Sequence, residues 1–383
     1  MVDSPTVRGH QHPQDGLHGT VAIVSGSVGA GHDGVAYELA SRLRARGHQV
    51  EVHDLLDGFP APIRFLLGAG YVLLIDVAPF LYELTCWLVE RSRLVQRIAD
   101  LVCGSARGWL LRAVEGADLV VGTYPPAGRA LGQLRRSGQL QIPVVTYLTD
   151  PAPNFLWVHP DVDVHLAAGA HTAQEASDRY GVDVEAVGPL VAPAFRSVDR
   201  AQARHTMREQ IGVPQNTPVA LLVLGSLGIG DVRKAARALT AAGICPVVLC
   251  ARNERLLRTL HGLPGVVGLG WREDVPALVA GADVVVHNAG GLSLTESLVA
   301  GTPAVTYAAL PGHGRANARS LERSGTAPWA RTTQELVALV STLATTSHLP
   351  WPLDQETATA RVSVLADGGG VGTAYDGQII DSA

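Results

Sequence analysis

The sequence has few cysteines, and none of them stands in the CxxC spacing that builds structural zinc sites. Cys86, Cys103, Cys245 and Cys250 are scattered along the chain, which fits a reducing compartment and buried core thiols. The chain also lacks an excess of basic residues. It carries 30 Lys and Arg against 35 Asp and Glu, a net charge of -5, whereas a nucleic-acid partner usually demands a basic surface. We therefore expect neither a metal centre nor a nucleic-acid ligand.

No apolar run continues uninterrupted for the ~20 residues needed to span a bilayer. The most apolar stretch, residues 63–90, is interrupted by Asp76, Pro79 and Glu83, and several arginines follow it. One interpretation is a core helix followed by a solvated one. The other is an interfacial patch, with apolar side chains in lipid and arginines facing anionic headgroups, on a protein at the inner, cytoplasmic face of the cell membrane. Residues 1–18 lack the charged start and apolar centre of a signal peptide, so we expect a disordered tail.

From residue 20 onward, short β-branched runs alternate with longer amphipathic stretches, which predicts parallel strands joined by crossover helices. The alternation stops at the proline-containing residues 187–200 and then starts again, so two Rossmann-like, doubly wound domains are expected. Such sheets bind ligands at the carboxyl ends of their strands, which places the active site in a cleft between the domains. We assign residues 19–197 to the N-terminal domain, 198–350 to the C-terminal domain and 351–383 to a C-terminal tail. The strands are expected at residues 20–25, 48–54, 118–123, 142–148 and 163–168, and at 218–224, 245–250, 265–270, 283–287 and 303–307.

Three glycines, Gly26, Gly29 and Gly31, stand where the first expected strand turns into a helix. They leave backbone N–H groups free at a positive helix end, where anions or developing negative charge are favoured. Their GxxGxG order matches neither the dinucleotide fingerprint nor the Walker loop, which disfavours nicotinamide and ATP. His32 follows at once. A helix start disfavours the imidazolium, and a general base must be neutral, so His32 is either a base or simply a cap of its helix.

A second strand, glycine pair and helix start lie within residues 287–303. Glu296, six positions after Gly290, falls inside that helix. Its carboxylate can accept two hydrogen bonds from the diol of a ribose while the helix start holds a diphosphate; alternatively, it pairs with a nearby arginine. A base in one domain and a diphosphate-ribose cradle in the other indicate group transfer from a nucleotide-linked donor.

With these residues in view, the chain resembles the monogalactosyldiacylglycerol synthase and diacylglycerol glucosyltransferase family of GT-B glycosyltransferases. It is more distantly similar to the enzyme that adds N-acetylglucosamine to the peptidoglycan lipid precursor. The resemblance runs from about residue 20 to residue 330. Its ordered markers are "GAGH" at 29–32, "YVLLIDVAPFLY" at 71–82, "IPVVTYLTD" at 142–150, "GPLVAPAF" at 188–195, "CARNE" at 250–254, "GWREDVPALVAGADVVVHNAGGLSLTE" at 270–296 and "PGHGRAN" at 311–317.

The resemblance implies an inverting transfer of a sugar from a UDP-sugar to a hydroxyl of a lipid acceptor such as diacylglycerol, without a cofactor or bound metal. The N-terminal domain would bind the acceptor and the C-terminal domain the nucleotide sugar. His32 would be the base, and Asp150 either the second candidate for that role, a group that positions the acceptor, or only a loop cap. The implied donor-binding residues are Gly225, Ser226, Gly228, Trp271, Arg272, Gly290, Gly291, Leu292, Ser293, Glu296, His313 and Asn317, and the acceptor-side residues are Gly29, Gly31, Asn154 and Trp157.

The sequence departs from the family at positions that govern specificity. Relatives carry a Gln and an acidic residue where this chain has His313 and Gly314, and those side chains hold hydroxyls of the transferred sugar. A family histidine is Asn154 here, and a family His-Pro appears as Tyr124 and Pro125. Both the sugar and the acceptor are therefore open. Three alternatives to a lipid glycosyltransferase remain: a glycosyltransferase acting on a hydrophobic secondary metabolite, a nucleotide-sugar 2-epimerase, and a non-catalytic GT-B subunit.

Overall fold

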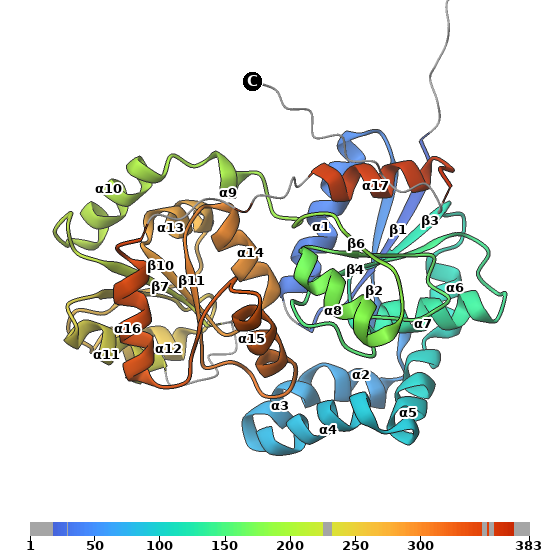
Figure 1. The fold of residues 1–383 in the computed structure, drawn as a ribbon, viewed down its shortest axis with the longest axis horizontal. Coiled ribbons are helices and arrows are strands. Elements are labelled where there is room, and N and C mark those ends of the chain that lie inside the picture. The colour runs from blue at the N-terminus through green and yellow to red at the C-terminus, as the bar shows by residue number, and fades with distance from the viewer. Residues whose placement is uncertain (1–17, 29, 225–231, 347–350, 352–355, 371–383) are drawn as a thin grey trace, which may run out of the picture.

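Two parallel sheets of six strands, each with helices packed on its faces, form the two halves of the chain (Figure 1). The computed structural model describes residues 18–28, 30–224, 232–346, 351 and 356–370. Runs rich in valine, leucine and isoleucine form the inner strands because parallel strands lie between two helical layers and are buried on both sides. The predicted α/β fold with two doubly wound domains is confirmed.

The N-terminal sheet has the order β2-β1-β3-β4-β5-β6, with every pair parallel. The chain moves outward in opposite directions from β1 and β3, so the topological switch point lies between these two strands. Ligands of open α/β sheets bind beyond the carboxyl ends of the strands at such a point. The elements are β1 (Thr20–Ser25), α1 (Ala30–Ala45), β2 (Gln49–Asp54), the 3-10 helix η1 (Leu55–Gly58), β3 (Leu119–Gly122), α7 (Pro125–Arg136), β4 (Val144–Leu148), β5 (Val164–Ala167), α8 (Ala170–Tyr180) and β6 (Val184–Ala186).

The C-terminal sheet has the order β12-β11-β10-β7-β8-β9, again all parallel, with its switch point between β7 and β10. Residues 288–290 leave the carboxyl end of β10, and residues 225–231, which come after β7 in the sequence, lie outside the described residues. The elements are α9 (Ala194–Ser197), α10 (Arg200–Ile211), β7 (Val219–Val223), α11 (Val232–Ala241), β8 (Cys245–Leu249), α12 (Glu254–Leu260), β9 (Val267–Leu269), α13 (Val275–Gly281), β10 (Val284–His287), α14 (Gly291–Val299), β11 (Ala304–Tyr307), α15 (His313–Arg323), β12 (Trp329–Ala330) and α16 (Thr333–Leu343).

The segment assigned to a C-terminal tail contains one helix, α17 (Glu356–Ala366), which returns to the N-terminal domain (Figure 1). Its apolar residues Ala358, Val362 and Leu365 join α1 and the sheet in one core cluster. The buried guanidinium of Arg361 donates to both carboxylate oxygens of Glu185, 2.8 and 2.9 Å away. The helix therefore completes the N-terminal core although it follows the C-terminal domain in sequence.

A helical excursion leaves the N-terminal sheet between β2 and β3. It consists of α2 (Ala61–Leu67), α3 (Ala69–Val77), α4 (Pro79–Arg91), α5 (Arg93–Gly104) and α6 (Arg107–Ala113), and its first part lies beside α15 of the other domain (Figure 1). Neither α2 nor α4 contains a buried residue, whereas Ile75 of α3 is buried, so residues 63–90 do not form the single core helix of the first interpretation. The chain bends at Gly68 and again at Ala78, before Pro79, because neither position continues a helix.

The ten expected strands are all present in the structure, with ends that differ by one or two residues. Two further strands, β6 and β12, were not predicted. They have three and two residues and stand at sheet edges, where a strand is too short to show a hydrophobic period.

Candidate active site

His32 lies in the first turn of α1, just beyond the carboxyl end of β1 at the N-terminal switch point. Its Nδ1 is 2.8 Å from the hydroxyl oxygen of Thr149, which follows β4. The rings of Tyr124 and Trp157 pack against the imidazole, with ring centroids 5.2 and 5.9 Å away. These contacts fix the ring plane. If Nδ1 donates to Thr149, Nε2 keeps the lone pair that a base uses.

Asp150, the second candidate base, is held in place by donors from both domains. The indole N–H of the fully buried Trp157 donates to one carboxylate oxygen at 3.0 Å, and the amide of Asn317 donates to the other at 3.2 Å. The same Asn317 accepts the backbone N–H of Ala152 at 3.0 Å and donates to the carbonyl of Ala289 at 3.2 Å. Trp157 therefore positions Asp150, and Asn317 joins the two halves of the site.

The turn before α14 is held by hydrogen bonds in an unusual backbone conformation. Ala289 has φ of 70°, a left-handed value that costs energy for a residue with a side chain and that often marks functional sites. Its N–H donates to Nδ1 of the buried His287, and Asn288 donates to the carbonyl of Leu224 at the end of β7. No side chain caps the start of α14 at Gly290. The first N–H groups of α14 therefore have no side-chain cap among the described residues.

The start of α14 meets the N-terminal domain directly. Gly291 packs against the carbonyl of Thr149, where even a methyl group would not fit. Leu292, next along α14, contacts the first turns of α1: a Cβ built on Gly34 would lie 2.5 Å from its side chain, and one on Gly31 would lie 3.8 Å from its Cβ. Two glycine-preceded helix starts, predicted separately in the two domains, therefore lie against each other.

Glu296 lies in the second turn of α14, half-buried, three residues after Ser293. Burial raises the pKa of its carboxyl to about 8. No described residue forms a hydrogen bond or ion pair with the carboxyl group of Glu296. The alternative pairing with an arginine is therefore not seen among the described residues. A buried carboxyl group without a partner is unfavourable unless something else supplies donors.

The two ends of α15 also contact the N-terminal domain. His313, at its start, has Nδ1 2.8 Å from the hydroxyl of Tyr82 on α4, and Arg315 forms an ion pair with Glu83. Farther along, Arg323 forms an ion pair with Glu175 on α8. Burial lowers the pKa of His313, which keeps it neutral. The helix therefore lies along the N-terminal domain, with its start beside His32 and Asp150.

Several predicted site residues are not part of this cluster. Gly29, Gly225, Ser226 and Gly228 lie outside the described residues. Trp271 and Arg272 follow β9, which is separated from β10 by β7 and β8. Trp271 is 63% exposed, with the Arg252 guanidinium 4.8 Å from its ring, and Arg272 pairs with Asp274.

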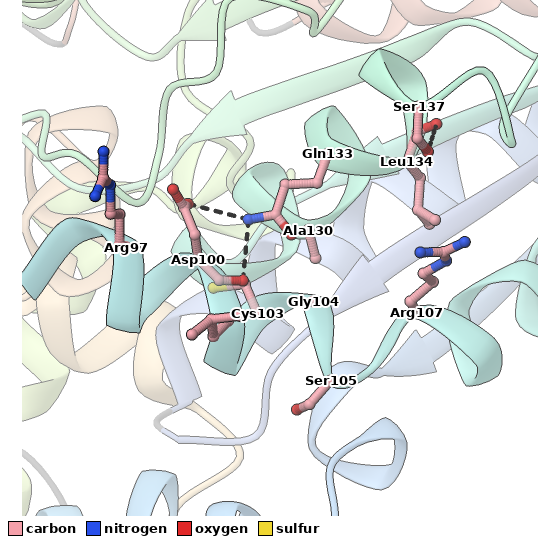
Figure 2. Close-up of a pocket in the computed structure, with 11 residues that line it drawn as sticks. Arg97, Asp100, Cys103, Gly104, Ser105, Arg107, Ala130, Gln133, Leu134 and Ser137 are labelled. Atoms are coloured by element: carbon pink, nitrogen blue, oxygen red, sulfur yellow. Dashed lines mark hydrogen bonds between the residues drawn. The ribbon is translucent and has the colours of Figure 1, made fainter. Parts of the chain in front are cut away.

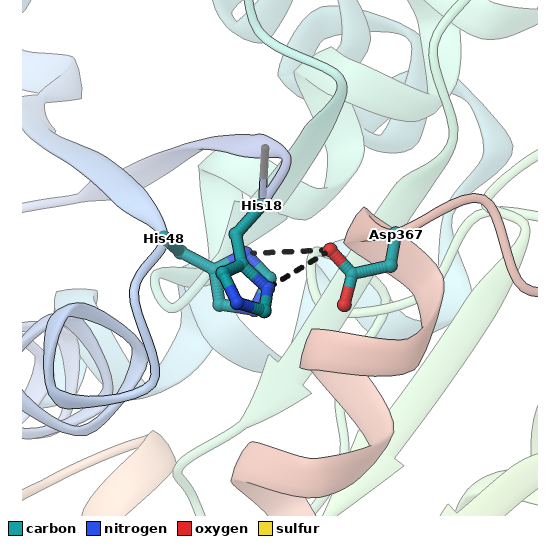
Figure 3. A group of neighbouring side chains, drawn as sticks. All are labelled: His18, His48 and Asp367. Atoms are coloured by element: carbon teal, nitrogen blue, oxygen red, sulfur yellow. Dashed lines mark ion pairs between the residues drawn. The ribbon is translucent and has the colours of Figure 1, made fainter. Parts of the chain in front are cut away.

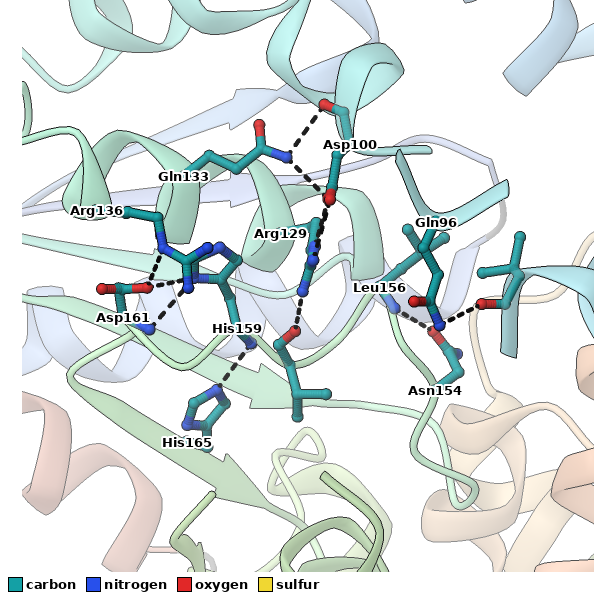
Figure 4. A network of polar contacts seen from close by, with 12 residues as sticks. Gln96, Asp100, Arg129, Gln133, Arg136, Asn154, Leu156, His159, Asp161 and His165 are labelled. Carbon is teal, nitrogen blue, oxygen red and sulfur yellow. Dashed lines mark hydrogen bonds and ion pairs between the residues drawn. The ribbon is translucent and has the colours of Figure 1, made fainter. Parts of the chain in front are cut away.

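The Asn154 side chain makes a contact within its own loop (Figure 4). Its side chain accepts the N–H of Leu156 at 3.0 Å and so shapes the loop that carries Trp157. In the same view, Arg129 on α7 ties Asp100 of α5 to this loop through the carbonyl of Val158. The position keeps a structural role in the loop although the family histidine is missing.

One group in the described part of the chain has side chains close enough to share a cation: His18, His48 and Asp367 (Figure 3). Both ring nitrogens of His48 already have partners, the carbonyl of Gly19 at 3.0 Å and the hydroxyl of Ser363 at 2.6 Å. The group lies at the amino end of β1, the opposite end from His32. It fastens α17 to the N-terminal domain and takes no part in the candidate active site.

Sequence reasoning missed Thr149 and Tyr82, which contact the two histidines of the site. Thr149 directly precedes Asp150 in "YLTD", and its hydroxyl is the group that orients His32. Its position beside a candidate base was the available signal in the sequence. Tyr82 ends "YVLLIDVAPFLY" and carries no pattern of its own, because its partner His313 is 231 residues away.

Known proteins resemble this chain in sequence and in fold. The family described as monogalactosyldiacylglycerol (MGDG) synthase matches residues 32–191. A processive diacylglycerol beta-glucosyltransferase of Bacillus cereus strain AH187 is 27% identical over 334 residues, covering 84% of this chain and 85% of that protein. MurG of Acinetobacter baumannii superposes with a TM-score of 0.52 at 19% identity, covering 91% and 94% of the two chains. Anabaena Alr3699/HepE, solved with UDP-glucose, also gives 0.52, at 15% identity and 92% and 93% coverage.

The fold defines the class first: the chain has the GT-B fold of its glycosyltransferase neighbours. Within that class it is related to the monogalactosyldiacylglycerol synthase and diacylglycerol glucosyltransferase family, and the resemblance drawn from its sequence motifs is confirmed.

Proposed function

We propose that this protein transfers a hexose from a UDP-sugar to the free hydroxyl of diacylglycerol, with inversion at the sugar carbon and without a bound metal. The observation that carries the proposal is that His32 and Asp150 lie beside the start of α14, which no side chain caps. An acceptor hydroxyl activated by His32 or Asp150 would lie next to a sugar whose diphosphate is held at the start of α14. The names of the relatives supply the acceptor and the donor classes.

The proposed chemistry is a single displacement. Nε2 of His32 takes the proton of the acceptor hydroxyl as its oxygen attacks the anomeric carbon, and the bond from that carbon to the UDP oxygen breaks. Attack from the side opposite the leaving group inverts the carbon. The N–H groups at the start of α14 stabilise the negative charge that develops on UDP, a role that a metal ion fills elsewhere. The Thr149 hydroxyl oxygen would accept a hydrogen bond from Nδ1–H of His32 and so keep Nε2 directed at the acceptor.

Donor binding requires the two domains to part. Gly291 and the Thr149 carbonyl are in direct contact, and a diphosphate is larger than the methyl group that already does not fit there. The hydrogen bond that Asn317 donates to Asp150 and the one that it accepts from the N–H of Ala152 cross the same boundary. We infer that the structure represents a closed arrangement, and that UDP-sugar enters when α14 and α15 withdraw from the loop after β4.

The first prediction is the reaction itself. Purified protein incubated with UDP-glucose, UDP-galactose or UDP-N-acetylglucosamine and vesicles containing diacylglycerol should form a glycosyl-diacylglycerol from at least one donor. Chromatography of the lipids and mass spectrometry identify the product. If UDP binds but no donor glycosylates diacylglycerol, the acceptor assignment is wrong, and soluble hydrophobic acceptors become the favoured class.

A lipid acceptor requires access to a membrane surface, and the helical excursion offers one. Its outer faces expose eleven large apolar side chains, an unusual density for a protein surface. Arg97 and Arg107 border a cavity of about 690 Å³ between α5 and α7 (Figure 2). We propose that this face lies on anionic lipid at the cytoplasmic side of the membrane. The exposed apolar residues are Phe65, Leu66, Leu73, Val77, Phe80, Leu81, Leu84, Trp87, Leu94, Ile98 and Leu101.

Among the described helices, none alone has the length and hydropathy to cross a bilayer. The neighbours α3 and α4 reach that threshold only as a pair, and the chain turns by 115° between them. Short helices that expose apolar residues beside arginines suit the interface between headgroups and acyl chains.

The second prediction concerns this surface. In vesicle flotation, the protein should float with anionic vesicles at low salt and be released as salt rises, because screening weakens the attraction of arginines for headgroups. Phe80→Asp, which charges a side chain that is 78% exposed on α4, should reduce flotation several-fold. Tyr37→Asp, at a 62% exposed position on α1, is the matched control and should float like the wild type. Equal flotation of both variants would remove α4 from the membrane contact.

A further inference from the structure

We infer that Tyr82, a residue of the N-terminal domain, positions His313 to bind the sugar of the donor, so that the sugar subsite is built from both domains. The inference rests on the proposed function and extends it. It names a positioning residue on α4, the helix whose other face carries the exposed Phe80 and Trp87.

The place of the sugar follows from the roles of its neighbours. Its diphosphate would lie at the start of α14, and its anomeric carbon must face the hydroxyl that His32 or Asp150 deprotonates. The hexose therefore lies between α14 and the loop after β4. The start of α15 borders this space, because Asn317 bonds both to Asp150 and to the turn before α14, and His313 stands one helical turn before Asn317.

The polar side chains at the start of α15 leave His313 as the group available to a hexose. Arg315 is committed to Glu83 on α4. Gly314 has no room for a side chain, since a Cβ there would lie 2.8 Å from the Cβ of Leu310. The acidic residue expected at this position from the relatives therefore cannot be restored by substitution alone.

Contacts from α3 and α4 hold the His313 ring in one orientation. The Tyr82 hydroxyl is 2.8 Å from Nδ1, and the rings of Tyr71 and Tyr82 stand edge to face 5.3 Å apart. Gly312, with φ of 66°, packs so closely on α4 that a Cβ would lie 2.6 Å from Sγ of Cys86. A neutral imidazole has one donor and one acceptor nitrogen. With the Tyr82 hydroxyl donating to Nδ1, the ring proton is on Nε2, which can donate to a hydroxyl oxygen of the sugar.

The geometry has a consequence for specificity. Tyr82 belongs to one domain and His313 to the other, so their hydrogen bond joins the two domains at the start of α15. The donor nucleotide can be held by the C-terminal domain alone, whereas recognition of the sugar also needs the contact between α15 and α4.

The test compares UDP with UDP-sugar, because UDP lacks the hexose. Calorimetric titrations of the wild type, Tyr82→Phe and a control are run with UDP and with the UDP-sugar that the wild type uses. Tyr82→Phe should weaken UDP-sugar binding by roughly 3- to 10-fold, the effect of one misplaced hydrogen bond, while UDP affinity stays within about 2-fold. The matched control is Tyr180→Phe. It removes a phenol hydroxyl that also binds α4, through Glu90 at 2.7 Å, but that does not touch His313. It should leave both affinities unchanged.

A second variant separates positioning from general damage. His313→Ala should show the same loss for UDP-sugar alone, and adding Tyr82→Phe to it should have no further effect, because Tyr82 acts through His313. Additive losses, equal losses for UDP and UDP-sugar, or no loss in either variant would overturn the inference. If the wild type binds neither UDP nor any UDP-sugar, the proposed function itself fails and this inference with it.

Discussion

His32→Ala should lower turnover by roughly 10²- to 10⁴-fold, the usual range for the loss of a general base. UDP affinity should stay near the wild-type value, because UDP is assigned to the C-terminal domain. The structure supports the base because Thr149, Tyr124 and Trp157 orient the ring, which a simple helix cap would not need. Steady-state kinetics and a UDP titration on the same purified variant provide the measurement.

The alternative role for His32 predicts a different pattern. A cap residue stabilises its helix by about 1 kcal/mol, so its loss would appear in the free energy of unfolding, with turnover largely kept. A folded His32→Ala protein with near-normal turnover would eliminate the base assignment. Asp150, held by Trp157 and Asn317 in the same cluster, would then become the favoured base.

Glu296→Ala should weaken UDP binding by roughly 10- to 150-fold, which corresponds to about 1.5 to 3 kcal/mol for hydrogen bonds to a charged group. The carboxyl group has no partner among the described residues, which fits a group reserved for the ribose diol. Glu322→Ala is a suitable control, since that carboxylate is on α15 of the same domain and pairs with Arg331 at 2.6 Å. Unchanged UDP affinity in a folded Glu296→Ala protein would remove Glu296 from the donor site.

The raised pKa of the Glu296 carboxyl group makes both the free energy of unfolding and the UDP affinity depend on pH. Its pKa is about 8 in the folded protein and 4.5 in an exposed glutamate. As pH rises from about 4.5 to 8, the unfolded chain ionises while the folded one keeps its proton, so the free energy of unfolding falls across this range and levels off above it. Glu296→Gln should remove this fall. A ribose that donates to the carboxylate favours the ionised form, so wild-type UDP affinity should rise over the same range.

Local pattern predicted the sheets of the two domains well. The inner strands are buried on both faces. Their continuous apolar runs, which alternate with helices along the chain, are typical of parallel sheets that have helices on both sides. The same reasoning selected His32, Gly290 and Glu296 as candidates, because a glycine turn between a strand and a helix is visible within about ten residues of sequence. The strand order that places these turns at the topological switch points comes from the structure, because the alternation of elements predicts parallel strands but not their order.

The contacts that finish the site could not be read from local pattern. Tyr82 and His313, Asn317 and Asp150, and α17 and α1 are each brought together by the arrangement of domains, across 167 to more than 300 residues. Residues 63–90 were ambiguous for a different reason. Apolar composition does not distinguish a core helix from one that faces lipid, and the structure shows one face of α4 exposed and the other packed on the start of α15.

In the proposed reaction the two domains have separate roles, with the base in one and the donor cradle in the other. Titration of UDP into wild-type, His32→Ala and Glu296→Ala proteins, each shown to be folded, tests this division. We predict that His32→Ala binds UDP like the wild type and that Glu296→Ala binds it at least about 10-fold more weakly, as the loss of charge-assisted hydrogen bonds requires. Loss of UDP binding in His32→Ala together with unchanged binding in Glu296→Ala would contradict the account.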